Sequence, residues 1–170
     1  MWRLRNNSRP VLTIPRTKTE WLWDIIGGGL FLATLVFFCT LLGDLPERVP
    51  GHINAAGEVD RWGGKGEIFI LPIVSVCIWV SMTILERFPH VHNYPQRLNE
   101  TNAKAFYLNS RKLLNTLKNI TTIIFSFFIF QDIRIAMGNA DSLGHWFLPA
   151  LIIATGIPII RALVKSSRIS

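Results

Sequence analysis

Four apolar runs, separated by polar segments, dominate the pattern of the 170-residue chain. A helix needs about 20 mostly apolar residues to cross a bilayer, and each run is close to that length. The pattern therefore predicts an all-α membrane protein with four transmembrane helices. Their expected ranges are about 25–43, 68–85, 117–137 and 146–164.

The polar segments complete the expected organisation. Residues 1–20 form a basic cytoplasmic arm, and residues 21–170 form a single four-helix membrane domain. Residues 44–67 are the loop between the first and second spans. Residues 86–116 are the loop between the second and third spans, so the two loops lie on opposite sides of the membrane.

The second loop ends in a segment with helical periodicity. Asn99 or Thr101 is placed to cap a helix that continues into the third span. Apolar and basic positions fall on different faces of this helix, which predicts a cytoplasmic amphipathic helix lying on the membrane surface. Its basic face consists of Lys104, Arg111 and Lys118.

Composition supports a membrane protein, and the placement of charge predicts its orientation. The chain is 49% hydrophobic, its mean hydropathy is +0.32 and its formal net charge is +7. Basic residues gather in residues 1–20, in residues 86–116 and near the C-terminal end, which the positive-inside rule assigns to the cytoplasm. We therefore expect a multi-pass protein of the bacterial inner (cytoplasmic) membrane with both termini cytoplasmic. Its expected contact is membrane lipid, not nucleic acid.

The first loop, which is then expected outside the cytoplasm, has the pattern of a short β-hairpin. Ala-Ala-Gly at residues 55–57 suits a three-residue turn with Gly57 in the left-handed conformation. Because side chains alternate along strands, the polar members of the cross-strand pairs are expected on one face. The predicted pairs are Asn54 with Glu58, Ile53 with Val59, and His52 with Asp60.

The pairing of His52 with Asp60 has three interpretations from the sequence. The carboxylate can hold the imidazole and fix the hairpin, the two side chains can bind a metal, or this face can bind a ligand or partner. Zinc needs four ligands, or three and a water, which one histidine and the carboxylates of one loop supply poorly. We therefore predict no metal and no cofactor, but a ligand- or partner-binding surface. Its expected residues are His52, Asn54, Asp60, Arg61, Trp62 and Lys65.

Two ionisable residues near the outer end of the third span also have two interpretations. Asp132 and Arg134 can extend to the membrane surface, as side chains near helix ends do. Alternatively, Asp132 pairs with a basic residue of the outer loop and docks the hairpin on the helix. The candidate partners are Arg48, Arg61 and Lys65.

Two motifs carry a resemblance to a known family. The first is LPERVPGHINAAGEVDRWGGK, followed by LP, and the second is FPHVHNYPQRLNETNA in the cytoplasmic loop. Together they resemble the domain of unknown function that precedes the SdpI domain in Sdp-type toxin immunity proteins. That domain also occurs as small standalone membrane proteins. The second motif draws attention to Asn93, Pro95 and Asn102.

None of the common catalytic motifs occurs in the sequence, such as G-x-S-x-G, H-E-x-x-H or a phosphate-binding loop. We therefore expect no enzyme. The expected function is to interact with a ligand, peptide or protein through the outer loop, in a sensing or toxin-immunity role that the resemblance implies. The alternative is a structural or accessory subunit of a membrane enzyme or transporter complex.

Overall fold

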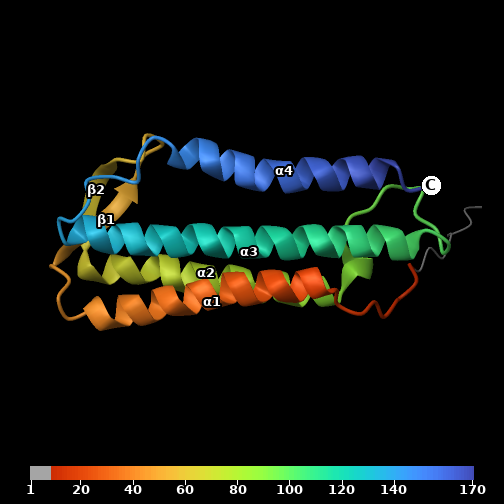
Figure 1. Ribbon diagram of the computed structural model, residues 1–170, viewed down its shortest axis with the longest axis horizontal. Coiled ribbons are helices and arrows are strands. Elements are labelled where there is room, and N and C mark those ends of the chain that lie inside the picture. Colours follow the sequence, from red (N-terminus) through yellow and green to blue (C-terminus); the bar gives the residue numbers. More distant parts are fainter. Residues whose placement is uncertain (1–8) are drawn as a thin grey trace, which may run out of the picture.

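A computed structural model describes residues 9–170, so residues 1–8, with Arg3 and Arg5 of the predicted basic arm, lie outside the described residues. The chain forms four long helices and one small antiparallel sheet (Figure 1). The helices are α1 (Lys18–Leu41), α2 (Ile70–Arg87), α3 (Ala103–Ala136) and α4 (Phe147–Ser167). The strands are β1 (Arg48–Ile53) and β2 (Val59–Gly64), and two 3₁₀ helices are η1 (Lys65–Phe69) and η2 (Pro89–Val91).

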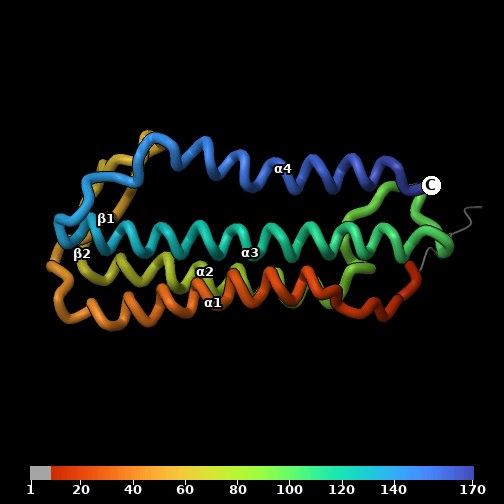
Figure 2. The backbone as a smooth tube through the Cα atoms, viewed as in Figure 1, coloured from red at the N-terminus to blue at the C-terminus, as the bar shows by residue number. Residues whose placement is uncertain are grey.

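Helix α3 is the centre of the molecule. It packs against α1 and α2 on one side and against α4 on the other (Figures 1 and 2). The sheet lies at one end of the helices, which we call the hairpin end (residues 42–69 and 137–146). We call the other end the terminal end (residues 9–17, 88–102 and 168–170), because the first described residues and the C-terminus both lie there.

The helices identify the chain as a multi-pass membrane protein. Within residues 9–170, four helices are long and apolar enough to cross a membrane. They are α1, α3, α4 and the unit Lys65–Arg87, in which η1 leads into α2. Large apolar side chains are exposed along α1, α2 and α4, where lipid would cover them. The four predicted helices and the predicted hairpin are thus confirmed.

Helix α1 begins before its apolar run because of a capping box. Thr17 Oγ1 accepts a hydrogen bond from the backbone N–H of Glu20 (3.4 Å), and Glu20 Oε2 accepts one from the N–H of Thr17 (2.6 Å). These bonds satisfy backbone donors that the first turn of a helix otherwise leaves unpaired. The capping box therefore places Glu20 in the first turn of the helix, on its inward side.

Helix α3 continues into the third span as predicted, but its first part differs from the prediction of an amphipathic helix lying on the membrane surface. Residues 103–136 form one unbroken helix, which runs straight in the orientation of Figures 1 and 2. Its N-cap is Asn102, whose side chain makes no capping bond, instead of Asn99 or Thr101. Arg111 and Lys118, predicted on an exposed basic face, are buried against α1 and α2, where they meet acidic partners.

The hairpin has the predicted turn and a register that differs by two irregularities. Gly57 has a φ of 84°, the left-handed conformation that the turn requires, and Ile53 pairs with Val59 as predicted. His52, however, pairs with Arg61 and not with Asp60, because the strands are irregular on both sides of His52. Such bulges add a residue to one strand and shift all later pairs.

The hairpin is fixed to the helices at both its tip and its base. At the tip, the N–H of Leu143 donates to the carbonyl oxygen of Gly57 (2.8 Å), and Glu58 forms a bridge with Ser142. At the base, fully buried Val49 joins an apolar core with α1, η1 and α3. The other members of that core are Phe38, Leu45, Ile68, Ile129 and Ile133.

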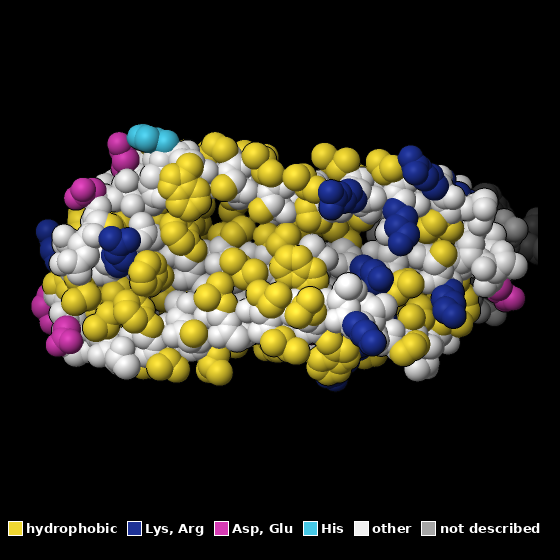
Figure 3. All heavy atoms as spheres, in the orientation of Figure 1, with side chains coloured by type: hydrophobic (Ala, Val, Ile, Leu, Met, Phe, Trp, Pro, Cys, Tyr) yellow, Lys and Arg dark blue, Asp and Glu magenta, His cyan; other side chains and the backbone are white. Residues whose placement is uncertain are grey.

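The two ends of the molecule differ in charge. On the face drawn in Figure 3, most Lys and Arg side chains lie over the half nearer the terminal end. Most of the Asp and Glu side chains, and the one visible His, lie at the hairpin end (Figure 3). The segregation seen in the sequence is therefore present in space.

Candidate functional site

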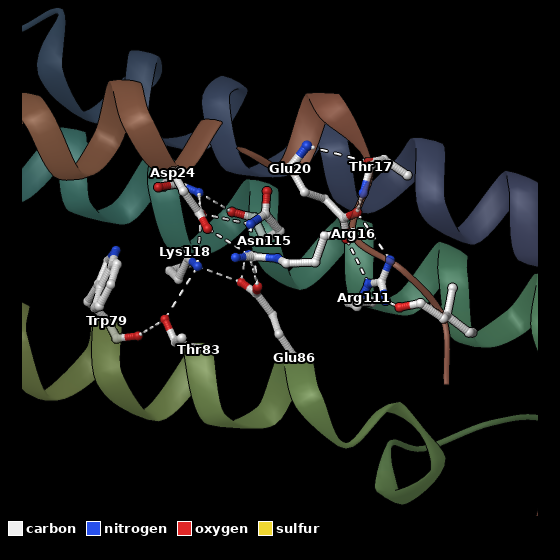
Figure 4. Close-up of polar contacts among 12 residues, drawn as sticks. Arg16, Thr17, Glu20, Asp24, Trp79, Thr83, Glu86, Arg111, Asn115 and Lys118 are labelled. Carbon is white, nitrogen blue, oxygen red and sulfur yellow. Dashed lines mark hydrogen bonds and ion pairs between the residues drawn. The ribbon is translucent and has the colours of Figure 1, made fainter. Parts of the chain in front are cut away.

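Six charged side chains meet inside the helix bundle near the terminal end (Figure 4). Three are acidic and three are basic, so their formal charges cancel. They come from the arm before α1 and from three helices, and we call them the buried ionic cluster. Its members are Arg16, Glu20, Asp24, Glu86, Arg111 and Lys118.

Lys118 is the centre of one half of the cluster. Its Nζ lies 2.9 Å from Asp24 Oδ1 of α1 and 2.8 Å from Glu86 Oε1 of α2, and its side chain is 0% exposed. The ammonium group also lies over the ring of Trp79, 5.2 Å from its centroid. A lysine removed completely from water is tolerated only when its charge is matched, and here two carboxylates match it.

Two arginines complete the cluster: Arg16 of the arm shares Asp24 and Glu86 with Lys118, and Arg111 of α3 binds Glu20. Arg16 Nη2 lies 2.6 Å from Asp24 Oδ2 and 2.7 Å from Glu86 Oε2. Arg111 Nε lies 2.7 Å from Oε1 of Glu20, 91 residues away in the chain, and its Nη atoms donate to the backbone carbonyls of Ile14 and Pro15. The cluster therefore joins the arm, α1, α2 and α3.

Two buried amides extend the cluster along α3. Asn115 Nδ2 and Asn119 Nδ2 each donate to Asp24 Oδ1 at 2.8 Å. Asn119 fits only because α1 has a glycine opposite it: a Cβ on Gly27 would lie 2.4 Å from Asn119 Oδ1. Of the three consecutive glycines at residues 27–29, Gly27 therefore allows the close approach of α1 and α3.

A cavity of about 510 Å³ opens beside the buried ionic cluster. Arg16, Glu86 and Arg111 line it together with residues of the arm and η2. Each of these charged groups is already paired with an opposite charge. This pairing favours a structural role, in which the cluster holds the helices together, over a role as a reactive group. Sequence reasoning missed this cluster because its residues lie at the ends of apolar runs, where charges commonly face water.

At the hairpin end, the structure brings His52 and Asp60 together despite the shifted register. His52 Nδ1 lies 2.6 Å from Asp60 Oδ1, and the two side chains are 62% and 45% exposed. Asn54 has a structural role, because its Oδ1 accepts the N–H groups of Ala56 (2.9 Å) and Glu58 (3.0 Å) inside the turn. The His52–Asp60 pair is therefore accessible from outside the hairpin, whereas the Asn54 side chain is used within the turn.

The side chains of the other predicted residues are not part of the His52–Asp60 contact. Arg61 Nη2 binds Glu67 Oε2 at 2.8 Å, and this hydrogen bond raises the pKa of Arg61 above its ordinary value. Trp62 is exposed, and the N–H of Lys65 donates to the carbonyl oxygen of Glu47 (2.9 Å). The structure thus divides the six predicted site residues between exposed side chains and the framework of the hairpin.

Asp132 does not dock the hairpin by an ion pair, so that prediction was wrong. It is 9% exposed, and its Oδ1 has no hydrogen-bond partner among the described residues. Arg61 is bound to Glu67, and Arg134 donates to Gln131 Oε1 (3.1 Å) and to the carbonyl oxygen of Asn139 (2.9 Å). Asp132 instead lines a cavity of about 260 Å³ under the hairpin, with His52 and Glu67 at other parts of its wall.

The residues of the second motif organise the loop before α3. Asn102 is buried, and its side chain accepts the N–H of Asn99 (2.8 Å) and donates to the carbonyl oxygen of Arg97 (3.1 Å). Asn93 is exposed and, with Pro95, lines a cavity of about 130 Å³. Asn102 therefore holds the fold of the loop, whereas Asn93 is accessible.

The fold and these sites define a multi-pass membrane protein with a helix-anchored hairpin. Residues 29–76 match the family described as "Domain of unknown function (DUF1648)", which covers most of α1, the hairpin and the start of α2. An uncharacterized protein of Archaeoglobus fulgidus is 42% identical over 71 residues, which are 41% of this chain and 37% of that protein. No solved structure matches the chain.

These matches agree with the resemblance at the level of a domain of unknown function. The match to the family ends at residue 76, so the second motif lies beyond it. The association with SdpI-type immunity proteins stays a prediction.

Proposed function

We propose that this protein binds a ligand or protein partner at its hairpin end, and that it acts by binding and not as an enzyme. The cavity of about 260 Å³ between the sheet, α2, α3 and α4 is the observation that carries the proposal. His52 belongs to its wall, and the exposed His52–Asp60 pair lies at its edge. Ligand sites are concave and mostly apolar, with a few polar groups that orient the ligand, and this cavity has that composition.

The proposed ligand arrives from outside the cytoplasm. Basic residues gather at the terminal end, and the positive-inside rule then orients both termini to the cytoplasm and the hairpin to the outside. A bacterial inner membrane is the location that we propose on this basis. The basic side chains in question include Arg87, Arg97, Lys104, Lys112, Arg161 and Lys165.

A sensing or toxin-immunity role fits this proposal. In such a role, a peptide occupies the hairpin end, and its effect reaches the terminal end through α3. That helix is continuous over 34 residues, about 50 Å at 1.5 Å per residue, and the buried ionic cluster joins it to α1 and α2. A rigid element shared by both ends is the physical requirement for coupling them.

Survival of cells exposed to a panel of membrane-active peptides tests the proposal. Cells expressing the wild type are expected to survive better than cells with the empty vector, and His52→Ala/Asp60→Ala is expected to lose that protection. Asn54→Ala is measured separately, because it removes the hydrogen bonds that Asn54 makes inside the turn. The pair is largely exposed, so its loss should cost less than about 1 kcal/mol of stability.

Glu47→Ala is the matched control, because Glu47 is an exposed carboxylate at the base of the same hairpin. Membrane abundance of each variant must equal that of the wild type. Protection that survives in His52→Ala/Asp60→Ala, or that Glu47→Ala loses equally, would contradict a binding site at this pair.

A second candidate function is that of an accessory subunit in a membrane complex. None of the residues of α4 is buried, and this helix packs mainly on α3. An apolar helix with so little internal contact has a free face for a partner helix, although lipid can cover it equally well. Cross-linking from a cysteine at Ile153 of α4, with Leu32 of α1 as the control position, would capture such a partner in native membranes.

A further inference from the structure

The wall of the cavity under the hairpin is mostly apolar and includes two acids, of which Glu67 is paired with Arg61. Its wall is formed by the first strand, by the start of α2, by one face of α3 and by the start of α4. Phe128 and Phe147 pack edge to face across it, with ring centroids 4.8 Å apart. The apolar members of the wall are Ile53, Ile70, Leu71, Phe128, Leu143 and Phe147.

Asp132 is the unusual member of this wall. It is 9% exposed, and its Oδ1 has no hydrogen-bond partner within residues 9–170. A buried polar group without a partner costs free energy, and an ionisable residue within a membrane helix commonly belongs to a functional site. Its position therefore requires either a proton or a positively charged partner.

The basic side chains near Asp132 are engaged elsewhere. Arg61 binds Glu67 at 2.8 Å and also donates to the carbonyl oxygen of Gly51. Arg134, two residues after Asp132 on α3, donates to Gln131 Oε1 and to the carbonyl oxygen of Asn139. Within residues 9–170, no Lys, Arg or His forms an ion pair with Asp132, so its carboxyl group is available to a charge from outside the described residues.

We infer that the cavity binds the cationic group of an amphiphilic ligand, with an ammonium or guanidinium group against Asp132 and an apolar body against the two phenylalanine rings. This inference rests on the proposed function and names the ligand class for the same site. Pockets for drug-sized ligands have volumes of about 300–1,000 Å³. At about 260 Å³, this one suits an arylalkylamine or a single basic side chain of a peptide.

Binding of phenethylammonium to the purified full chain in phosphatidylcholine nanodiscs tests the inference. Phenethyl alcohol and 3-phenylpropionate are the neutral and anionic comparison ligands. Binding of each ligand to nanodiscs without protein measures its partition into the lipid. Equilibrium dialysis is expected to show that the wild type binds the ammonium at least about tenfold more tightly than the alcohol, as a charge-assisted hydrogen bond provides. Equal binding of the ammonium and the alcohol would overturn the inference.

Substitutions of Asp132 provide the second part of the test. Asp132→Asn is expected to abolish the preference for the ammonium, whereas Asp132→Glu retains it. Glu47→Gln is the matched control, because Glu47 is an exposed carboxylate of the same hairpin end that belongs neither to the cavity wall nor to the His52–Asp60 pair. Circular dichroism verifies that each variant is folded. A preference that persists in Asp132→Asn would overturn the inference, as would its loss in Glu47→Gln.

The same assay distinguishes a peptide side chain from a small amine as the source of the cation. It also distinguishes a failure of the inferred ligand class from a failure of the proposed function. Displacement of phenethylammonium by an amphipathic peptide of Leu and Lys would assign the site to a peptide side chain. Displacement by hexylammonium alone would assign it to small amines. If no ammonium binds while His52→Ala/Asp60→Ala still loses protection in cells, the ligand class is wrong and the proposed function stands.

Discussion

Lys118 Nζ of α3 lies 2.8 Å from Glu86 Oε1 of α2, and the Lys118 side chain is completely buried. The same ammonium group reaches Asp24 of α1, so a single side chain joins three helices. A charge at this depth contributes to the fold only while its partners are present, since removal of one partner leaves the others buried and unpaired. The arrangement of the bundle at the terminal end therefore depends on a few specific side chains.

The first prediction concerns Lys118. Lys118→Met leaves Asp24 and Glu86 with Arg16 as their only basic partner, and we expect a loss of about 3–5 kcal/mol in the free energy of unfolding. Unfolding in mixed micelles at increasing dodecyl sulfate measures it. Lys112→Met is the control on the same helix, because Lys112 is half-buried and is not part of the cluster.

A double variant makes this prediction more specific. Lys118→Met/Glu86→Gln removes one charge of each sign and should recover part of the stability that Lys118→Met loses. Equal stability of Lys118→Met and Lys112→Met would contradict the assignment of a structural role to the cluster.

A second prediction tests the close approach of α1 and α3. Gly27→Ala places a carbon 2.4 Å from Asn119 Oδ1 and 3.1 Å from Asn119 Cβ, so the two helices must separate or the amide must move. We expect a loss of about 1–3 kcal/mol, as for other overpacked positions. Gly28→Ala is the neighbouring control, because nothing lies within 4 Å of its added carbon. Similar unfolding curves for the two variants would show that the contact is not required.

A third prediction concerns the tip of the hairpin. Gly57 has a φ of 84°, and an added Cβ would lie 2.9 Å from the carbonyl oxygen of Gly144. Gly57→Ala should therefore cost about 1–3 kcal/mol locally and release the tip from the loop before α4. Faster hydrogen exchange at the N–H of Leu143, which donates to Gly57, would report that release. Gly66→Ala, which meets no atom within 4 Å, should leave this exchange rate unchanged.

A fourth prediction follows from Tyr94 in the loop before α3. Burial raises the pKa of Tyr94 from 10.0 to about 12, while its hydroxyl donates to the carbonyl oxygen of Pro89 (2.8 Å). The folded protein thus holds the proton more tightly than the unfolded chain does. The stability that Tyr94 contributes is fully present below pH 10.0 and is lost as the pH rises through about 12.

Tyr94→Phe should remove this part of the pH dependence. Stability measured against pH in the wild type and in the variant gives the difference, and the ultraviolet absorbance of tyrosinate gives the titration itself. A Tyr94 midpoint at the value of free tyrosine, or parallel stability curves for both proteins, would contradict the prediction.

Local sequence determined the elements of this fold. Four apolar runs of spanning length predicted four helices, because length and hydropathy are properties of each run alone. The turn around Gly57 was equally predictable, since few residues other than glycine adopt its backbone conformation. The strand register between Ile53 and the base of the hairpin was not predictable, because the irregularities on both sides of His52 depend on how the strands pack on the helices.

Only the tertiary structure decided which charged residues are buried and what they contact. Arg111 and Lys118 have the spacing of a solvated basic face, and nothing nearby in sequence marks them as buried. Their partners lie on other helices, with Glu20 as far as 91 residues from Arg111. In the same way, Asp132 has basic residues within reach in the sequence, yet it lines an apolar cavity because Arg61 and Arg134 bind elsewhere. The sequence by itself determined the helices and the turn through local periodicity and backbone preference, whereas the ion pairs and cavities required the packing of distant segments.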